Sequence, residues 1–72
     1  MHTRNVFNIF ITKKNNDIAL RHAISIIIED GVVIVLCESI TDGKLHLRKH
    51  TTMLETVLRI DVDNIPIYKC DY

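Results

Sequence analysis

Glycine is almost absent from this chain, which has only Gly31 and Gly43 among its 72 residues. A phosphate-binding loop needs several glycines close together, so these two isolated positions exclude nucleotide hydrolysis by a P-loop. Serine occurs only as Ser25 and Ser39, and neither lies in a nucleophile-elbow pattern. We therefore predict no catalytic residue, no cofactor and a protein that is not an enzyme.

Cysteine and aromatic residues are also scarce. The two cysteines, Cys37 and Cys70, do not form the dense framework of small secreted domains, so we expect two reduced thiols. Cys37 lies in the most apolar stretch and is expected in the core, whereas Cys70 is expected to be accessible. With no tryptophan and 6% aromatic residues, the core must consist mainly of isoleucine, valine and leucine.

An excess of charge is the next missing feature. Nine basic and nine acidic side chains cancel, which removes the whole-molecule argument for nucleic acid or an anionic membrane as partner. The longest apolar runs, Ile26–Ile28 and Val32–Cys37, are far shorter than the roughly 20 residues that cross a bilayer. With no apolar signal segment at the N-terminus, we predict a soluble, cytoplasmic protein with no membrane partner.

Isoleucine is abundant instead, with twelve residues against two alanines. Residues with AT-rich codons outnumber those with GC-rich codons, which indicates an AT-rich genome. A low-GC bacterium, its phages or plasmids, and an archaeal virus all fit this composition.

Alternating apolar side chains predict a strand over Val6–Thr12, central in its sheet because both faces are mostly apolar. From Ile18 to Asp30 the apolar residues follow a helical period, and Gly31 suits the position after a helix. The rival interpretation makes Ala23–Ile28 a strand that ends in a hairpin turn.

The surest strand is Val32–Glu38, which is followed by the turn signal Thr41-Asp42-Gly43. Residues 44–49 alternate again, with Leu45 and Leu47 on one face. The two strands are expected to form a hairpin.

A capping-box pattern, Thr52-Met53-Leu54-Glu55, predicts a short helix that ends near Ile60. The competing interpretation is a strand over Thr56–Val62. Ile65–Tyr68 is predicted to be a final strand, which Pro66 confines to an edge or to the first residues of the strand.

The resulting order is strand, helix, strand, strand, helix, strand. This is the order of the ferredoxin-like α+β sandwich, so we predict that fold in a single compact domain over residues 1–72. If both helices fail, the alternative is a small all-β meander or barrel.

The apolar run Val32–Cys37 is the first candidate interaction site. In a ferredoxin-like order this strand lies at a sheet edge, where an apolar strand tends to pair with another chain. We therefore predict a non-catalytic protein that binds a protein partner and forms a homodimer. Inhibition or regulation of a host protein by a phage or mobile-element product is a role that fits this prediction. The residues of this edge are Val32, Val33, Ile34, Val35, Leu36 and Cys37.

The second candidate site is the basic cluster at residues 44–50. Its members, placed along an open sheet face, would neutralise phosphates and make the chain a nucleic-acid-binding module. No aromatic residue alternates with them, although sheet-based RNA binders need such rings for stacking. The cluster comprises Lys44, His46, Arg48, Lys49 and His50.

Metal sites are not predicted. His46 and His50 have a helical ligand spacing, but on a strand the interval is about 13 Å, too far for one ion. Asp61 and Asp63 are interpreted as a solvated turn, because they precede Asn64 and Pro66.

Overall fold

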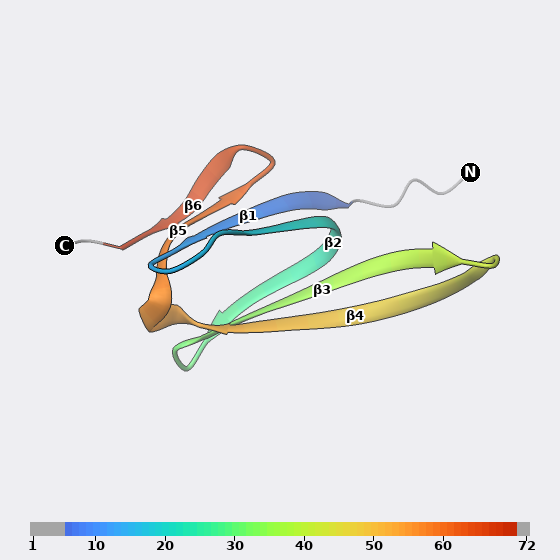
Figure 1. The fold of residues 1–72 in the computed structure, drawn as a ribbon, viewed down its shortest axis with the longest axis horizontal. Helices are drawn as coiled ribbons and strands as arrows, with labels where there is room; N and C mark the ends of the chain where they lie inside the picture. The colour runs from blue at the N-terminus through green and yellow to red at the C-terminus, as the bar shows by residue number, and fades with distance from the viewer. Residues whose placement is uncertain (1–5, 71–72) are drawn as a thin grey trace.

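The computed structural model describes residues 6–70, which form six strands and one short 3-10 turn (Figure 1). The strands are paired antiparallel throughout, in the order β4-β3-β2-β1-β5-β6. The elements are β1 (Phe7–Lys13), β2 (Ile18–Glu29), β3 (Val32–Thr41), β4 (Lys44–Met53), η1 (Leu54–Thr56), β5 (Val57–Val62) and β6 (Ile65–Lys69). The predicted α+β sandwich is therefore wrong, and the all-β alternative is right.

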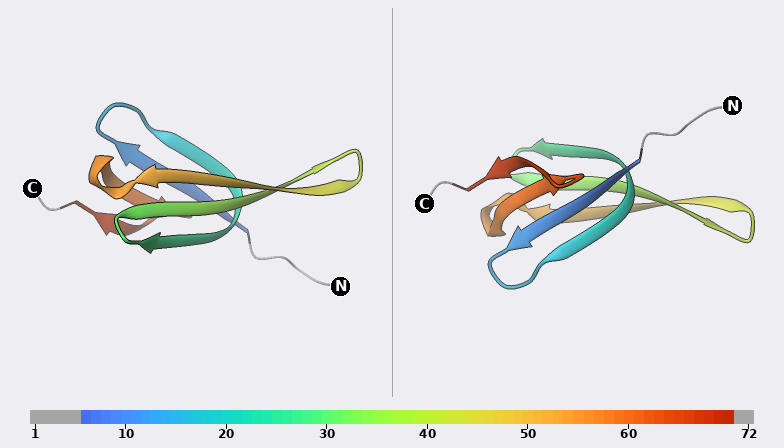
Figure 2. Two further views of the ribbon diagram at one scale, coloured as in Figure 1. Left: turned by 90° about the horizontal axis from the view of Figure 1, so that it is seen from below. Right: turned by 90° about the horizontal axis from the view of Figure 1, so that it is seen from above.

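The sheet bends strongly, so that its two halves face each other. Figure 2 shows β1 crossing the β3–β4 hairpin at a steep angle. The η1 turn carries the chain from β4 back to the other half, where β5 pairs with β1. Two backbone hydrogen bonds fix this return: Leu54 N–H donates to Gly31 O at 2.9 Å, and Lys14 N–H donates to Thr56 O at 3.0 Å.

The core fills the space between the two halves. Its nine buried side chains come from four strands, and most are β-branched, which suits a pleated, two-sided packing surface. As the composition predicted, isoleucine, valine and leucine dominate it. The core residues are Ile9, Ile11, Leu20, Ala23, Val33, Val35, Cys37, Val57 and Ile60.

Extra residues in β2 explain how the sheet bends. Phe7 and Ile9 of β1 pair with Ala23 and Leu20, so two steps along β1 match three steps along β2. A second register shift, against β3, lies between Ala23 and Ser25. Each shift is a β-bulge, which adds a residue to one strand and bends it.

The same bulges gave β2 the sequence pattern of a helix. Leu20, Ala23 and Ile26 face inward at every third position, whereas an unbroken strand would bury every second one. A spacing of three imitates the stripe of an amphipathic helix. The predicted helix over residues 18–30 is therefore wrong, and the rival strand is right.

The second predicted helix fails for a similar reason. Val57 and Ile60 are both fully buried and three positions apart, because a register shift in β5 lies opposite Thr12 and Lys13. The capping-box residue Thr52 lies in β4 and is buried, and no side chain caps the η1 turn. Only three residues of the predicted helix form a helical turn.

Three two-residue turns close the hairpins β2–β3, β3–β4 and β5–β6. Both residues of each turn have positive φ, the signature of type I′ turns, whose twist matches that of paired strands. The turn at Asp42–Gly43 confirms the predicted hairpin, and Asp30–Gly31 ends β2 as the rival interpretation required. The third turn is Asp63–Asn64.

The strand predictions outside the two helices are confirmed. β1 is central, between β2 and β5, and β6 is an edge strand that contains Pro66. Cys37 is buried in the core, and Cys70 is half-buried.

The β3–β4 hairpin extends beyond the core and makes the molecule long. We call its distal part, Glu38–Leu47, the arm; in Figure 1 it reaches farthest along the long axis. The molecule measures 44 × 22 × 20 Å, and its radius of gyration is 13.1 Å. A globular chain of this length would have a radius of gyration of about 11 Å. The arm, which protrudes along the long axis, contributes to this excess.

Candidate interaction surfaces

The strand β3 is not an edge strand, contrary to the prediction for Val32–Cys37. It lies between β2 and β4, so its backbone is paired on both sides. The prediction rested on the ferredoxin-like order, in which this strand would be terminal. Its side chains nevertheless divide between the two faces: Val33, Val35 and Cys37 are in the core, and the others face outward.

An apolar surface covers the outside of the β2–β3–β4 half of the sheet. Along β3 it consists of the residues that alternate with the core, and the cross-strand pairs Ile27–Ile34 and Ile40–Leu45 extend it to both neighbours. We call this surface the outer apolar face. Its residues are Ile27, Val32, Ile34, Leu36, Ile40, Leu45, Leu47 and Met53.

The outer apolar face is open to solvent. Ile40 is 75% exposed, Leu47 is 61% exposed, and Met53 is 50% exposed. No other element within residues 6–70 covers these side chains. Glu38 and Lys49 interrupt this face, opposite Leu47 and Leu36. Single exposed leucines are ordinary, but several large apolar side chains exposed on one face of a sheet are typical of an interaction site.

The basic cluster divides between the two faces of β4. Lys44, His46, Arg48 and His50 alternate along one face and form what we call the basic row; Lys49 lies on the opposite face, beside Leu36. The basic row shares its face with Cys37 and the core, so it continues the concave side of the sheet along the arm. The sequence pattern predicted this alternation but not which face is concave.

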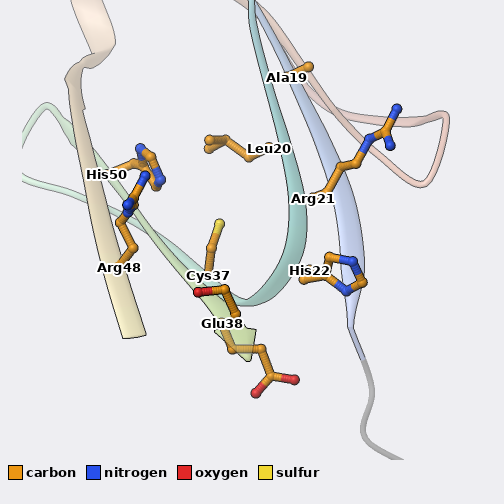
Figure 3. Close-up of a pocket in the computed structure, with 9 residues that line it drawn as sticks. Ala19, Leu20, Arg21, His22, Cys37, Glu38, Arg48 and His50 are labelled. Atoms are coloured by element: carbon orange, nitrogen blue, oxygen red, sulfur yellow. The ribbon is translucent and has the colours of Figure 1, made fainter. Parts of the chain in front are cut away.

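A groove of about 410 Å³ lies where the basic row meets the core. In Figure 3 the side chains of Arg48 and His50 lie together and extend toward Leu20, as does the thiol of Cys37, while Arg21 and Glu38 point away. The groove therefore has a basic wall on β4 and an apolar floor. Arg21 and His22 form its opposite rim.

The pKa of the Cys37 thiol depends on two features of this groove. Burial raises the pKa of its thiol, and the positive charge of Arg48, its cross-strand partner, lowers it to a smaller extent. A thiol with a raised pKa is a poor nucleophile at neutral pH. The Cys37 thiol is therefore not an activated nucleophile in this groove.

The two edges of the sheet differ in length and chemistry. β4 has ten residues with no break in its pairing to β3, and it contains no acidic residue. β6 has five residues, and its Pro66 cannot donate a backbone hydrogen bond. Of the two edges, β4 is the longer and the more regular.

The acidic pair at the other end of the sheet has structural partners. The Asp61 carboxylate accepts a hydrogen bond from Arg59 Nε at 2.9 Å, and the Asp63 carboxylate accepts one from the backbone N–H of Asn8, also at 2.9 Å. The Asp63 carboxylate therefore joins the β5–β6 turn to β1, whereas the Asp61 carboxylate pairs with a neighbour in its own strand, β5. Among residues 6–70, no group of three histidine, cysteine or acidic side chains is arranged to hold a metal ion.

No protein-family model, curated protein or solved structure shows significant similarity to the chain. Within the described residues, no helix has the length and apolar character needed to cross a membrane. The function must therefore be inferred from the surfaces themselves.

Proposed function

We propose that this is a non-catalytic binding protein whose partner is another protein, and that the outer apolar face is the contact surface. The observation that carries the proposal is the exposure of Ile40, Leu45 and Leu47 side by side on the arm. Burying these side chains in a complex would gain about 25 cal/mol for each Å² of apolar surface removed from water. Regulation or inhibition of a host protein is a role compatible with this mode of binding.

A foreign protein fits the surface better than a second copy of the chain. Two copies paired edge to edge along β4 would place Lys44, Arg48 and Lys49 near their own equivalents, and β4 has no acidic residue to offset them. Like charges placed opposite each other across an interface weaken binding by several kcal/mol. The predicted homodimer is therefore an alternative outcome of the test.

Nucleic-acid binding is the second candidate function, and the basic row supports it. Lys44, His46 and Arg48 stand in line on one face, as a groove that follows a phosphate backbone requires. However, β4 has no phenylalanine, tyrosine or tryptophan for base stacking, and phosphates would leave Leu45 and Leu47 exposed. A protein partner uses more of the observed surface.

Site-specific photo-crosslinking tests the proposed contact surface. We would place p-benzoylphenylalanine at position 47 on the arm, or at the control position 67 on β6, and irradiate each protein in an extract of the cells that encode it. Leu47 and Ile67 are both well exposed, at 61% and 49%. We expect a discrete protein adduct from position 47 alone.

A competition experiment shows which surface of the protein binds the crosslinked partner. Unlabelled parent protein and its Ile67→Ser variant should suppress it equally, whereas the Ile40→Ser/Leu45→Ser double variant should not. Because all three residues are exposed, the variants should keep the parent circular dichroism spectrum. A nuclease-sensitive adduct, a self-adduct of twice 8.3 kDa, equal competition by all variants, or no discrete adduct would each contradict the proposal.

A further inference from the structure

The β4 edge carries a more specific inference, which rests on the proposed function: we infer that it binds an extended segment of the partner protein by strand addition. The segment is predicted to alternate acidic and apolar residues. Three features of the arm support this inference, namely the free backbone of β4, the charge of the basic row and the apolar side chains on the other face.

The backbone of β4 is available to a further strand. An antiparallel ladder turns the N–H and C=O groups of every second residue of an edge strand away from its partner. With a two-residue turn at Asp42–Gly43, the outward groups of β4 are those of Leu45, Leu47, Lys49 and Thr51. Their pairing to β3 is regular over the whole strand, so they form an even template.

The side chains of β4 specify the chemistry of the added strand. Residues of that strand opposite Lys44, His46 and Arg48 would lie on the concave side, where carboxylates complement the basic row. Residues opposite Leu45 and Leu47 would lie on the outer apolar face and extend it. An alternating acidic and apolar segment satisfies both faces at once.

The same charges disfavour a second copy of β4 as the added strand. Antiparallel pairing of β4 with itself would set lysine and arginine side chains opposite one another, and like charges directly opposed destabilise a sheet. The β6 edge is a poor substitute, because Pro66 interrupts its backbone donors. The positive charges of β4 therefore favour a partner segment that carries negative charge.

A synthetic peptide tests the inference directly. The probe is a fluorescein-labelled peptide of alternating glutamate and valine, as long as the ten residues of β4. Fluorescence anisotropy should detect its binding, and a peptide of alternating lysine and valine should not bind. N-methylation of alternate amides of the glutamate peptide should abolish binding, because it removes backbone donors and leaves every side chain in place.

Charge-reversal variants locate the binding site. Lys44→Glu/Arg48→Glu should weaken peptide binding by roughly tenfold or more, since each reversal converts an attractive cross-strand pair into a repulsive one. Lys69→Glu on β6 is the matched control and should leave binding within about twofold. In the nuclear magnetic resonance spectrum of the complex, the amides of Leu45, Leu47 and Lys49 should become protected from hydrogen exchange.

Several outcomes would overturn strand addition. They are equal binding of the N-methylated peptide, perturbed amides that lie outside β4, an equal effect of Lys69→Glu, or no binding. An oligothymidylate that binds β4 in place of the peptide would assign the basic row to nucleic acid. If the crosslink from position 47 forms but the peptide does not bind, the proposed function stands and this inference alone fails.

Discussion

Cys37 and Arg48 face each other across β3 and β4, at the end of the core, where the core and the basic row overlap. The pair joins a buried thiol, whose pKa is raised by burial, to a guanidinium group that opposes that shift. The balance between desolvation and charge at this position is open to measurement.

Alkylation kinetics should show the influence of Arg48 on this thiol. In a Cys70→Ser background, we expect Arg48→Gln to move the midpoint of the pH–rate profile for iodoacetamide to higher pH, because the lost cation no longer stabilises the thiolate. Lys49→Gln is the control, since Lys49 lies on the opposite face. Mass spectrometry would follow the reaction, and an unchanged midpoint in Arg48→Gln would refute the coupling.

The raised pKa of Cys37 also predicts how stability depends on pH. The native thiol stays neutral at pH values where the unfolded one ionises, so its contribution is complete below the ordinary pKa of 9.0 and is lost as pH rises through the native pKa. We expect the free energy of unfolding of the parent to fall relative to that of Cys37→Ala between about pH 8 and about pH 10. Urea titrations at each pH would measure the free energy of unfolding of both proteins. If this free energy changed with pH by the same amount in the parent and in Cys37→Ala, the prediction would be contradicted.

Two isoleucines should respond very differently to truncation. Ile60 is fully buried, so Ile60→Ala should lower the free energy of unfolding by about 2 to 5 kcal/mol. Since a chain of this length has a total stability of roughly 4 to 11 kcal/mol, this variant is expected to lie near the limit of folding. Ile40→Ala removes the same atoms from an exposed position and should cost less than about 1 kcal/mol. Equal losses in thermal unfolding would mean that the arm packs against the body.

His22 has a left-handed backbone at the β2 bulges, with φ of 57°. We expect His22→Val to lose about 1 to 2 kcal/mol, because a β-branched side chain is strained in this region. His22→Gly should be tolerated. The control is Asn16→Val, at a residue outside the positive-φ set. Chemical denaturation of the three variants would show whether the bend of β2 depends on this conformation.

The sequence allowed half of the fold to be predicted, and the bulges explain the other half. Where pairing is regular, as in β3 and β4, strict alternation and the Asp42–Gly43 signal gave the strands and their turn. Where bulges interrupt pairing, as around His22 and in β5, buried residues are three apart and resemble a helix face. A bulge depends on neighbouring strands that are distant in sequence, so local periodicity does not reveal it.

The candidate surfaces were predictable in part. The alternation of Leu45 and Leu47 with the basic residues was read correctly from the sequence, as was the apolar character of both faces of Val32–Cys37. What the sequence could not show was that β4, and not β3, is an edge strand. That assignment depends on β5 joining β1 across the molecule, which is a property of the whole topology.

The pairing of β5 with β1 has a consequence for synthesis of the chain on the ribosome. Ile11 and Ile60 are cross-strand partners, yet nearly fifty residues separate them in the sequence. A nascent chain that has emerged only as far as the arm lacks Val57 and Ile60, and its apolar residues have no opposite wall to pack against. Such non-local contacts slow folding. The partly synthesised strands β1 to β3 must therefore avoid aggregation until the last third of the chain has been made. The polar and basic residues of the arm would help to keep it in solution during that interval.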